Sequence, residues 1–176
     1  MKHSMCWLIG LASLGLAATV SEAPAQSPSV SIETEYLGTM ELQLDAPQVV
    51  GPVRIVNVPG GTLKGPKIGG TIVAPSGDWV NIMPDGTLRL DVRASIKTDD
   101  GEFILIAYNG LIAPNKDATD RYNNGEVITS NDEYFLTVPR FTTASKKYDW
   151  LNKVQAVGKM VAFQKGKLKY DLFLVR

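Results

Sequence analysis

The hydrophobic pattern along the chain consists of short apolar runs rich in Val, Ile, Leu, Tyr and Thr, separated by turns that contain Pro, Gly, Asn or Asp. Runs of this length and composition are typical of β-strands joined by hairpins. Nine strands are predicted, at residues 40–44, 53–58, 68–74, 79–83, 88–98, 103–111, 134–138, 154–163 and 168–175. One short helix is expected at residues 115–124, between Pro114 and Gly125. The pattern therefore predicts an all-β fold, a single antiparallel β-barrel or closed sandwich of about nine strands with one short helix.

The turn at residues 83–87 determines the register of the two strands that it joins. Its sequence suits a type I turn followed by Gly86 in the left-handed conformation. Such a turn pairs its first residue with its last. Counting back along both strands, we expect Trp79 to lie opposite Asp91.

A second turn, at residues 98–103, joins the next pair of strands. It contains an Asp-Gly pair, which favours a two-residue hairpin loop. That loop would pair Asp99 with Glu102. Under this register, Tyr108 lies opposite Arg93.

Because side chains alternate across a strand, the two registers divide these three strands into two faces. The apolar face is expected to form the core and carries Val80, Ile82, Leu88, Leu90, Val92, Ala94, Ile96, Leu105 and Ala107. The other face combines polar and aromatic side chains with two isoleucines and carries Trp79, Asn81, Arg89, Asp91, Arg93, Ser95, Ile104, Ile106 and Tyr108. It is either a solvated sheet face or a partly covered face that lines a small-molecule site. The two isoleucines, Ile104 and Ile106, favour the second interpretation, in which part of this face is covered.

Charge and composition exclude several classes of partner and chemistry. The chain has 18 basic and 18 acidic residues and no basic cluster, which argues against a nucleic-acid partner. Its single cysteine, Cys6, and single histidine, His3, both lie in the first 25 residues. Without that segment, the chain has no thiol nucleophile, no histidine base and no Cys or His ligand for zinc. We therefore expect no metal and no cofactor.

The first 25 residues follow the order of a secretory signal peptide. Lys2 precedes an uncharged apolar run at residues 5–20, and Ala23-Pro24-Ala25 supplies a small-residue cleavage site. We expect cleavage after residue 25, a periplasmic or secreted location, and no membrane contact after cleavage. The expected organisation is a signal peptide at residues 1–25, a flexible segment at 26–38 and a single β domain at 39–176.

Several short motifs occur in order between residues 51 and 176. They are Gly60-Gly61 and Gly65, Asp78-Trp79, Pro84-Asp85-Gly86, the stretch LDVRASIKTDDGEFI at 90–104, Tyr134-Phe135, Pro139-Arg140-Phe141, Tyr148 and Trp150-Leu151-Asn152. In this combination the chain resembles the DUF3237 family, also called UPF0311, of small uncharacterised proteins. The resemblance implies a compact β-barrel-like fold and no agreed reaction. The family's polar motif residues correspond here to Asp78, Trp79, Asp91, Arg93, Asp100 and Trp150.

Three functions remain open. The first is an exported protein that binds a small, apolar or aromatic molecule bearing a carbonyl or carboxylate. Its predicted ligand-binding residues are Trp79, Asp91, Arg93, Tyr108 and Trp150. The second is an isomerase, lyase or hydrolase without metal or cofactor, in which Asp91 transfers a proton and Arg93 stabilises an oxyanion. The third is a homodimeric assembly module whose polar and aromatic face forms the subunit contact.

Overall fold

The computed structural model describes residues 30–176, of which residues 32–176 form one compact unit. The expected signal peptide lies outside the described residues. The elements are β1 (Thr34–Gln43), β2 (Gln48–Val50), β3 (Val53–Asn57), β4 (Gly60–Lys64), β5 (Gly69–Ile82), β6 (Leu88–Thr98), β7 (Phe103–Ala113), α1 (Lys116–Asn123), β8 (Tyr134–Thr142), the 3₁₀ helix η1 (Asp149–Lys153), β9 (Gln155–Gln164) and β10 (Lys167–Val175). β1 thus begins before residue 39, where we expected the domain to start.

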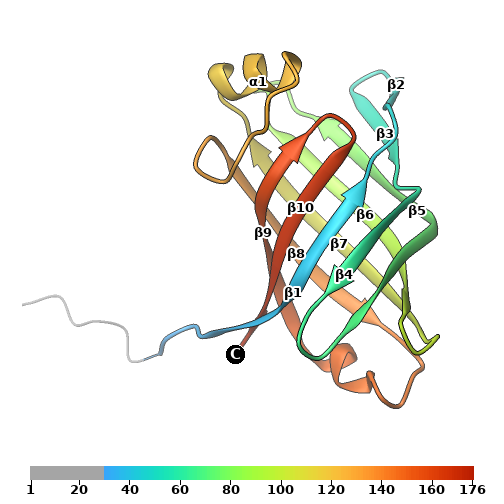
Figure 1. The fold of residues 1–176 in the computed structure, drawn as a ribbon. Coiled ribbons are helices and arrows are strands. Elements are labelled where there is room, and N and C mark those ends of the chain that lie inside the picture. Colours follow the sequence, from blue (N-terminus) through green and yellow to red (C-terminus); the bar gives the residue numbers. More distant parts are fainter. Residues whose placement is uncertain (1–29) are drawn as a thin grey trace, which may run out of the picture. The chain divides into compact units, whose positions relative to one another are not determined.

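The strands form one antiparallel sheet that closes into a barrel. The order is β2-β3-β5-β4-β1-β10-β9-β8-β7-β6, and a further pairing of β5 with β6 closes the sheet (Figure 1). Eight strands make the barrel, and the hairpin of β2 and β3 extends it, because β3 pairs with the second half of β5. The prediction of an all-β fold with a closed barrel and one short α-helix is confirmed.

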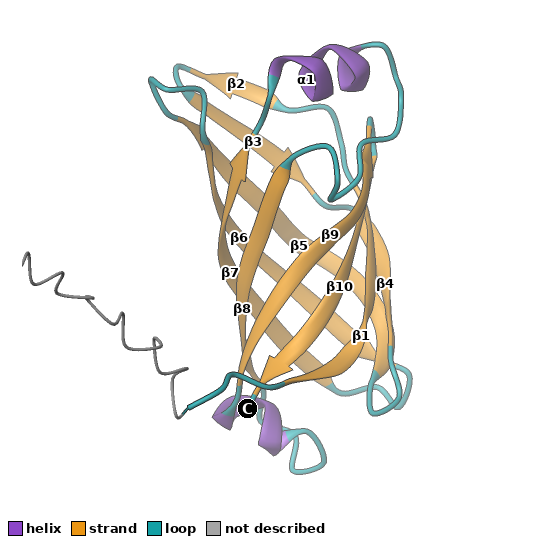
Figure 2. Cartoon of the chain, turned by 90° about the vertical axis from the view of Figure 1, so that its left-hand side faces the viewer, coloured by secondary structure: helices purple, strands orange, loops and turns teal. Residues whose placement is uncertain are grey.

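The two ends of the barrel differ. Helix α1 lies at the end where the β2–β3 hairpin projects, and η1 lies at the opposite end (Figures 1 and 2). α1 occupies the segment where a helix was expected, and its first turn is capped by the Asn115 side chain, which accepts a hydrogen bond from the Ala118 N–H at 2.8 Å. We call the α1 end the mouth of the barrel.

The register of β5 and β6 is the one predicted from the turn at residues 83–87. The Met83 N–H donates to the Thr87 carbonyl at 2.8 Å, and Gly86 has a φ of 85°. The pairs Asp78–Val92 and Asn81–Arg89 follow the same count, which places Trp79 beside Asp91. The inward positions of β6 are buried as expected and are Leu90, Val92, Ala94 and Ile96.

The register of β6 and β7 differs by one residue from the prediction. The turn is a three-residue loop, in which the Thr98 N–H donates to the Glu102 carbonyl at 2.9 Å and Gly101 adopts a φ of 92°. The Thr98 hydroxyl stabilises this wider loop because it also accepts a hydrogen bond from the Glu102 N–H at 2.8 Å. Tyr108 consequently pairs with Val92 rather than Arg93.

This shift moves every side chain of β7 to the other face. Ile104, Ile106 and Tyr108 are buried inside the barrel, whereas Leu105 lies on the outer surface with 41% of its area exposed. The two isoleucines on the expected polar face were the sign that the count was wrong.

Two segments that lie outside the nine predicted strands belong to the sheet. The residues Pro75-Ser76-Gly77 do not end a strand but form a bulge within the 14-residue strand β5. The Gly60-Gly61 pair begins strand β4, which was not among the nine predicted strands, and pairs with Gln43 and Leu42 of β1. Gly61 fits there because a Cβ would lie 2.3 Å from the Glu41 carbonyl oxygen.

Candidate functional site

The barrel interior contains one row of residues that crosses three strands at mid-height. Asp78 of β5 pairs with Val92 of β6, and Val92 pairs with Tyr108 of β7. All three positions face inward, because Val92 and Tyr108 are buried and Asp78 lines an interior cavity. Tyr108 also packs edge-to-face against Tyr170 of β10, with ring centroids 6.2 Å apart. The row and the Tyr170 ring that packs against it therefore place a carboxyl group and two phenols inside the barrel.

An interior cavity of about 100 Å³ lies beside this row. Its wall is apolar except for Asp78 and Tyr170. The lining residues are Leu42, Leu44, Val56, Val58, Asp78, Val80, Leu88, Leu90, Ile112, Phe135, Phe163, Leu168 and Tyr170. A few polar groups in a mainly apolar cavity are typical of sites for small molecules.

Asp78 is the ionisable group most altered by this environment. Burial raises its pKa from 3.8 to about 7, and the neighbouring Asp91 carboxylate adds to the rise. One hydrogen bond opposes it: the Asp91 N–H donates to Asp78 Oδ1 at 3.1 Å. Near neutral pH, Asp78 is therefore present in both the protonated and the ionised form.

The two interior phenols stay protonated across the physiological range. Burial and the negative charge of Asp78 raise the pKa of both Tyr108 and Tyr170. A protonated phenol both donates and accepts hydrogen bonds. Asp78 and Tyr170 can therefore bind either a hydroxyl or a carbonyl group in the cavity.

Aromatic rings connect this row to the mouth. Tyr170 contacts Phe135 edge-to-face at 5.4 Å, and Phe135 contacts Phe163 at 6.0 Å. Phe163 is stacked on Tyr122 of α1, with centroids 4.6 Å apart. The series continues from Tyr108 in the interior to the helix that lies at the mouth.

A larger pocket of about 470 Å³ opens at the mouth, between the strand ends and α1. It is lined mostly by apolar side chains, among them Ile82 and Ile112, and it also carries two charged residues, Arg54 and Glu133. Five residues line both this pocket and the interior cavity: Val56, Val80, Leu88, Ile112 and Phe163. A molecule that enters the mouth therefore meets the wall of the cavity that contains Asp78.

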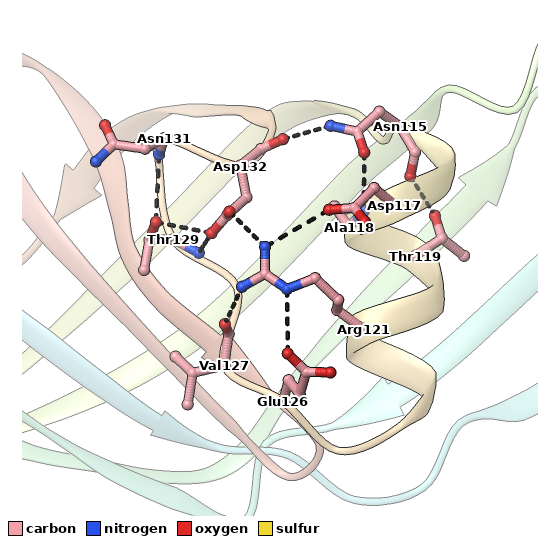
Figure 3. Close-up of polar contacts among 10 residues, drawn as sticks. All are labelled: Asn115, Asp117, Ala118, Thr119, Arg121, Glu126, Val127, Thr129, Asn131 and Asp132. Carbon is pink, nitrogen blue, oxygen red and sulfur yellow. Dashed lines mark hydrogen bonds and ion pairs between the residues drawn. The ribbon is translucent and has the colours of Figure 1, made fainter.

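Helix α1 is held at the mouth by a polar network around Arg121 (Figure 3). The Arg121 guanidinium lies 2.7 Å from Asp132 and 3.2 Å from Glu126, and it also donates to the Val127 carbonyl at 3.3 Å. Asp132 in turn accepts hydrogen bonds from the backbone and the hydroxyl of Thr129. This network fixes α1 to the segment between α1 and β8, which also contributes Ile128 and Glu133 to the mouth pocket.

Three residues predicted as a site lie on the outside of the barrel instead. Trp79 is 44% exposed, and Asp91 forms a 3.2 Å ion pair with Arg93 in which both side chains are about half exposed. Trp79 and Arg93 line an outer groove of about 540 Å³, together with Leu105. The structure thus keeps Trp79, Asp91 and Arg93 together and separates Tyr108 from them by the barrel wall.

Trp150 and Asp100 lie at the end of the barrel away from the mouth. Trp150 belongs to η1 and packs against the core with its side chain partly buried. Asp100 accepts hydrogen bonds from the Lys147 ammonium group at 2.5 Å and from the Tyr148 hydroxyl at 3.0 Å. These contacts tie the turn between β6 and β7 to the segment before η1, which is a structural role.

Within residues 30–176, no group of three or more His, Cys, Asp or Glu side chains has the geometry to hold a metal ion. In the same part of the chain, no helix is long and apolar enough to cross a membrane.

Sequence reasoning missed most of the interior site. Among the predicted residues, Asp78 enters only through the family motif, and no pattern in the sequence singles out Tyr170, Phe163 or Arg54. A signal for Asp78 was available, because it is two residues before Val80 and so occupies a core-facing position of its strand. A carboxyl group at a core-facing position indicates a special environment.

The fold and its interior define a small antiparallel β-barrel with a mainly apolar interior cavity, which contains the partly buried carboxyl group of Asp78 and adjoins a pocket that opens at one end. The chain belongs to the DUF3237 family of proteins of unknown function, whose family model matches residues 32–175. This confirms the resemblance noted in the sequence.

Known relatives share the fold and carry little functional description. A UPF0311 protein of Clostridium acetobutylicum is 31% identical over 103 residues, which span 58% of this chain and 65% of that protein. The crystal structure of a conserved protein of unknown function from Rhodopseudomonas palustris has a TM-score of 0.78 and 25% identity, and the match covers 84% of this chain and all of that one. The structure of an enzyme from Penicillium herquei has a TM-score of 0.58 and 20% identity, covering 86% and 99%.

Proposed function

We propose that the protein binds a small, largely apolar molecule inside its barrel. The observation that carries this proposal is the position of Asp78 in the wall of an apolar cavity that adjoins the mouth pocket. Burial of a carboxyl group costs free energy unless its polar atoms are matched. Among residues 30–176, the one hydrogen bond to Asp78 comes from the Asp91 N–H. A ligand in the cavity would supply another.

The site favours a ligand with an apolar body and one hydroxyl or carbonyl group. The body would contact the aliphatic and aromatic wall, and the polar group would lie between Asp78 and Tyr170. The mouth pocket of about 470 Å³ lies within the range of roughly 300–1,000 Å³ that is usual for small-molecule sites. In this proposal the polar group is bound by Asp78 and Tyr170 rather than by Asp91 and Arg93, which form an ion pair on the outer surface with both side chains about half exposed.

A second candidate function is proton transfer to or from such a molecule, without metal or cofactor. Asp78 favours it, because a carboxyl group with a pKa of about 7 can both give and accept a proton near neutral pH. Asp78 would move the proton, and the phenol of Tyr170 would donate a hydrogen bond to the oxygen where charge develops. The enzyme from Penicillium herquei shows that this barrel occurs in a catalyst, and its 20% identity supports only the fold.

We further propose that the protein is exported. The support is the order of charged start, apolar run and small-residue site in the first 25 residues. Edman sequencing of protein from the periplasm or medium is expected to begin near Gln26. Intact Met1 on protein in the membrane fraction would contradict export.

Native mass spectrometry of protein purified from its own organism tests the binding proposal. We expect an added mass that is lost on denaturation and absent from a Val80→Trp variant, because Val80 lines both the cavity and the mouth pocket. Circular dichroism and a thermal melt would verify that the variant is folded. A ligand that remains bound to the folded variant would place the site elsewhere, and the outer groove beside Trp79 would be the next candidate.

A further inference from the structure

Arg54 is the one basic residue that lines the mouth pocket in the described part of the chain. It lies on β3 and pairs with Val80, so its side chain is one inward position closer to the mouth than Asp78 on β5. Its inward direction follows from alternation, because Val53 and Ile55 face the other way and Ile55 lines the outer groove. A positive charge therefore lies at the entrance of the apolar pocket.

The protein supplies few partners for this charge. Arg54 Nη1 donates to the carbonyl groups of Gly51 at 3.0 Å and Val53 at 3.3 Å, which hold the guanidinium at the rim of the β2–β3 hairpin. Among residues 30–176, no carboxylate lies within 4.0 Å of it, and no acceptor is found for its Nε or Nη2. The N–H groups on these two nitrogens are the ones that form paired hydrogen bonds with a carboxylate or a similar oxyanion.

The acidic residue of the same pocket does not neutralise Arg54. Glu133 lines the mouth, but the described residues include no ion pair or hydrogen bond that joins it to Arg54. Burial, and then the nearby Asp132 carboxylate, raise the pKa of Glu133 above its ordinary value. The guanidinium of Arg54 is therefore not paired with the acidic residue of its own pocket.

We propose that Arg54 binds the anionic head group of an amphiphilic ligand whose apolar body extends into the barrel. This inference rests on the proposed function, since it assigns a ligand class to the same pocket. The ligand would carry one carboxylate, sulfonate or comparable oxyanion at one end, and a hydroxyl or carbonyl at the other would reach Asp78 and Tyr170. A neutral molecule of the same shape would lose the contact with Arg54 and keep the apolar contacts.

A matched pair of fluorescent probes tests the assignment. Anilinonaphthalene sulfonate carries a sulfonate on an aromatic body, and N-phenylnaphthylamine has the same body without the charge. We expect the wild type to bind both probes in the mouth pocket and a folded Val80→Trp variant to bind neither. Arg54→Gln should weaken binding of the sulfonate by at least about ten-fold and binding of the neutral probe by less than about two-fold, because only the former loses a charge-assisted hydrogen bond.

Three further variants separate charge recognition from general damage to the pocket. Arg140→Gln removes an exposed positive charge from the outer face of β8 and should change neither affinity. Glu133→Gln alters the same mouth but removes a negative charge, so it should leave sulfonate binding equal or tighter. Arg54→Lys keeps the charge without the paired donors and should fall between the wild type and Arg54→Gln, which provides a second readout if the glutamine variant does not fold.

The outcomes distinguish this inference from the proposed function. The role of Arg54 is overturned, while binding in the barrel stands, if Arg54→Gln leaves the affinity for the sulfonate unchanged or lowers the affinities for both probes equally. The same conclusion follows if Glu133→Gln lowers the affinity for the sulfonate as much as Arg54→Gln does. If the wild type binds neither probe, or the folded Val80→Trp variant binds both, the proposed function and this inference are both contradicted.

Discussion

Asp78 and Trp79 are neighbours in the chain, but they lie on opposite sides of the barrel wall. The Asp78 carboxyl lines the interior cavity, whereas the Trp79 ring lies in the outer groove with 44% of its area exposed. The alternation of side chains along β5 causes this separation. It divides the polar family motif into an interior part and an exterior part, which can be tested independently.

Replacing Asp78 with asparagine should change how stability depends on pH. The folded protein raises the pKa of Asp78 from 3.8 to about 7, so between pH 4 and pH 7 the folded state binds a proton that the unfolded state has lost. The wild type is therefore expected to lose stability as pH rises through this range and to level off above it. Asp78→Asn removes this loss, and it should raise the free energy of unfolding at pH 8 by about 2–4 kcal/mol.

Urea denaturation of both proteins at pH 4.5 and pH 8 measures this effect. We expect the two proteins to be closest in stability at the lower pH and furthest apart at the higher pH. Equal stabilities at pH 8 would show that Asp78 is not held in an apolar environment.

The Asp91–Arg93 ion pair should contribute little, because both side chains are about half exposed. Asp91→Asn is expected to change the free energy of unfolding by less than about 1 kcal/mol and to leave the affinity for a barrel ligand unchanged. The affinities of Asp91→Asn and Asp78→Asn for the same probe can be compared directly. A loss of binding in the Asp91 variant, with Asp78→Asn unaffected, would move the site to the outer face.

Breaking the Arg121 network should loosen helix α1 without unfolding the barrel. Arg121→Met removes the contacts with Asp132, Glu126 and the Val127 carbonyl, whereas Tyr122 can still stack on Phe163. We expect faster amide hydrogen exchange in α1 and unchanged exchange in β6 and β7. Lys116→Met is the matched control on the same helix, because it removes an exposed ion pair with Asp120.

The same network predicts a local effect of acid. The pKa of Asp132 is lowered from 3.8 to about 2, mainly by the hydrogen bond from Arg121 and secondly by the hydrogen bond from the Thr129 N–H. A carboxylate with a lowered pKa stabilises the folded state above its unfolded pKa, and this stabilisation is lost as pH falls from about 4 to about 2. The amide chemical shifts of Thr129 and Asp132 should therefore change in that range, and a transition centred at the ordinary value would contradict the ion pair.

The sequence was sufficient for the fold class and for one hairpin. Alternating apolar residues in β6 and the Gly86 turn predicted the inward positions of β6 and the neighbours of Trp79 correctly, because both depend on local backbone preferences. The length of the second loop depends on the Thr98 hydroxyl and its bond to the Glu102 N–H, which the Asp-Gly pair does not reveal. This error of one residue in the predicted register assigned every side chain of β7 to the wrong face of the sheet.

The interior site could be predicted only in part, since its members come from strands that meet through closure of the barrel. Alternation alone places Asp78 on a core-facing position. Its place in the same inward row as Tyr108 requires the correct register of β7, and its proximity to Tyr170 requires that β10 faces β5 across the interior. The inward position of Arg54 at the mouth depends on the pairing of β3 with the second half of β5, beyond the bulge in that strand.

The last prediction concerns the turn that fixes this register. Thr98 is buried, and its hydroxyl accepts the Glu102 N–H at 2.8 Å while donating to Asp100 Oδ1 at 2.6 Å. Thr98→Val preserves the shape of the side chain and removes both bonds. We expect it to lower the free energy of unfolding by about 1–2 kcal/mol, because the Glu102 N–H loses the hydroxyl that accepts its hydrogen bond. Amide exchange at Glu102 should also accelerate.

Thr137→Val provides a control at an equally buried threonine of β8. The Thr137 hydroxyl makes one long hydrogen bond, 3.4 Å to the Gly158 carbonyl, so its removal should cost less than about 1 kcal/mol. If both variants lose the same stability, the cost comes from the loss of a buried hydroxyl in general. A larger loss for Thr98→Val, with faster exchange limited to the turn, would attribute the register of β7, and hence the inward position of Tyr108, to the Thr98 hydroxyl.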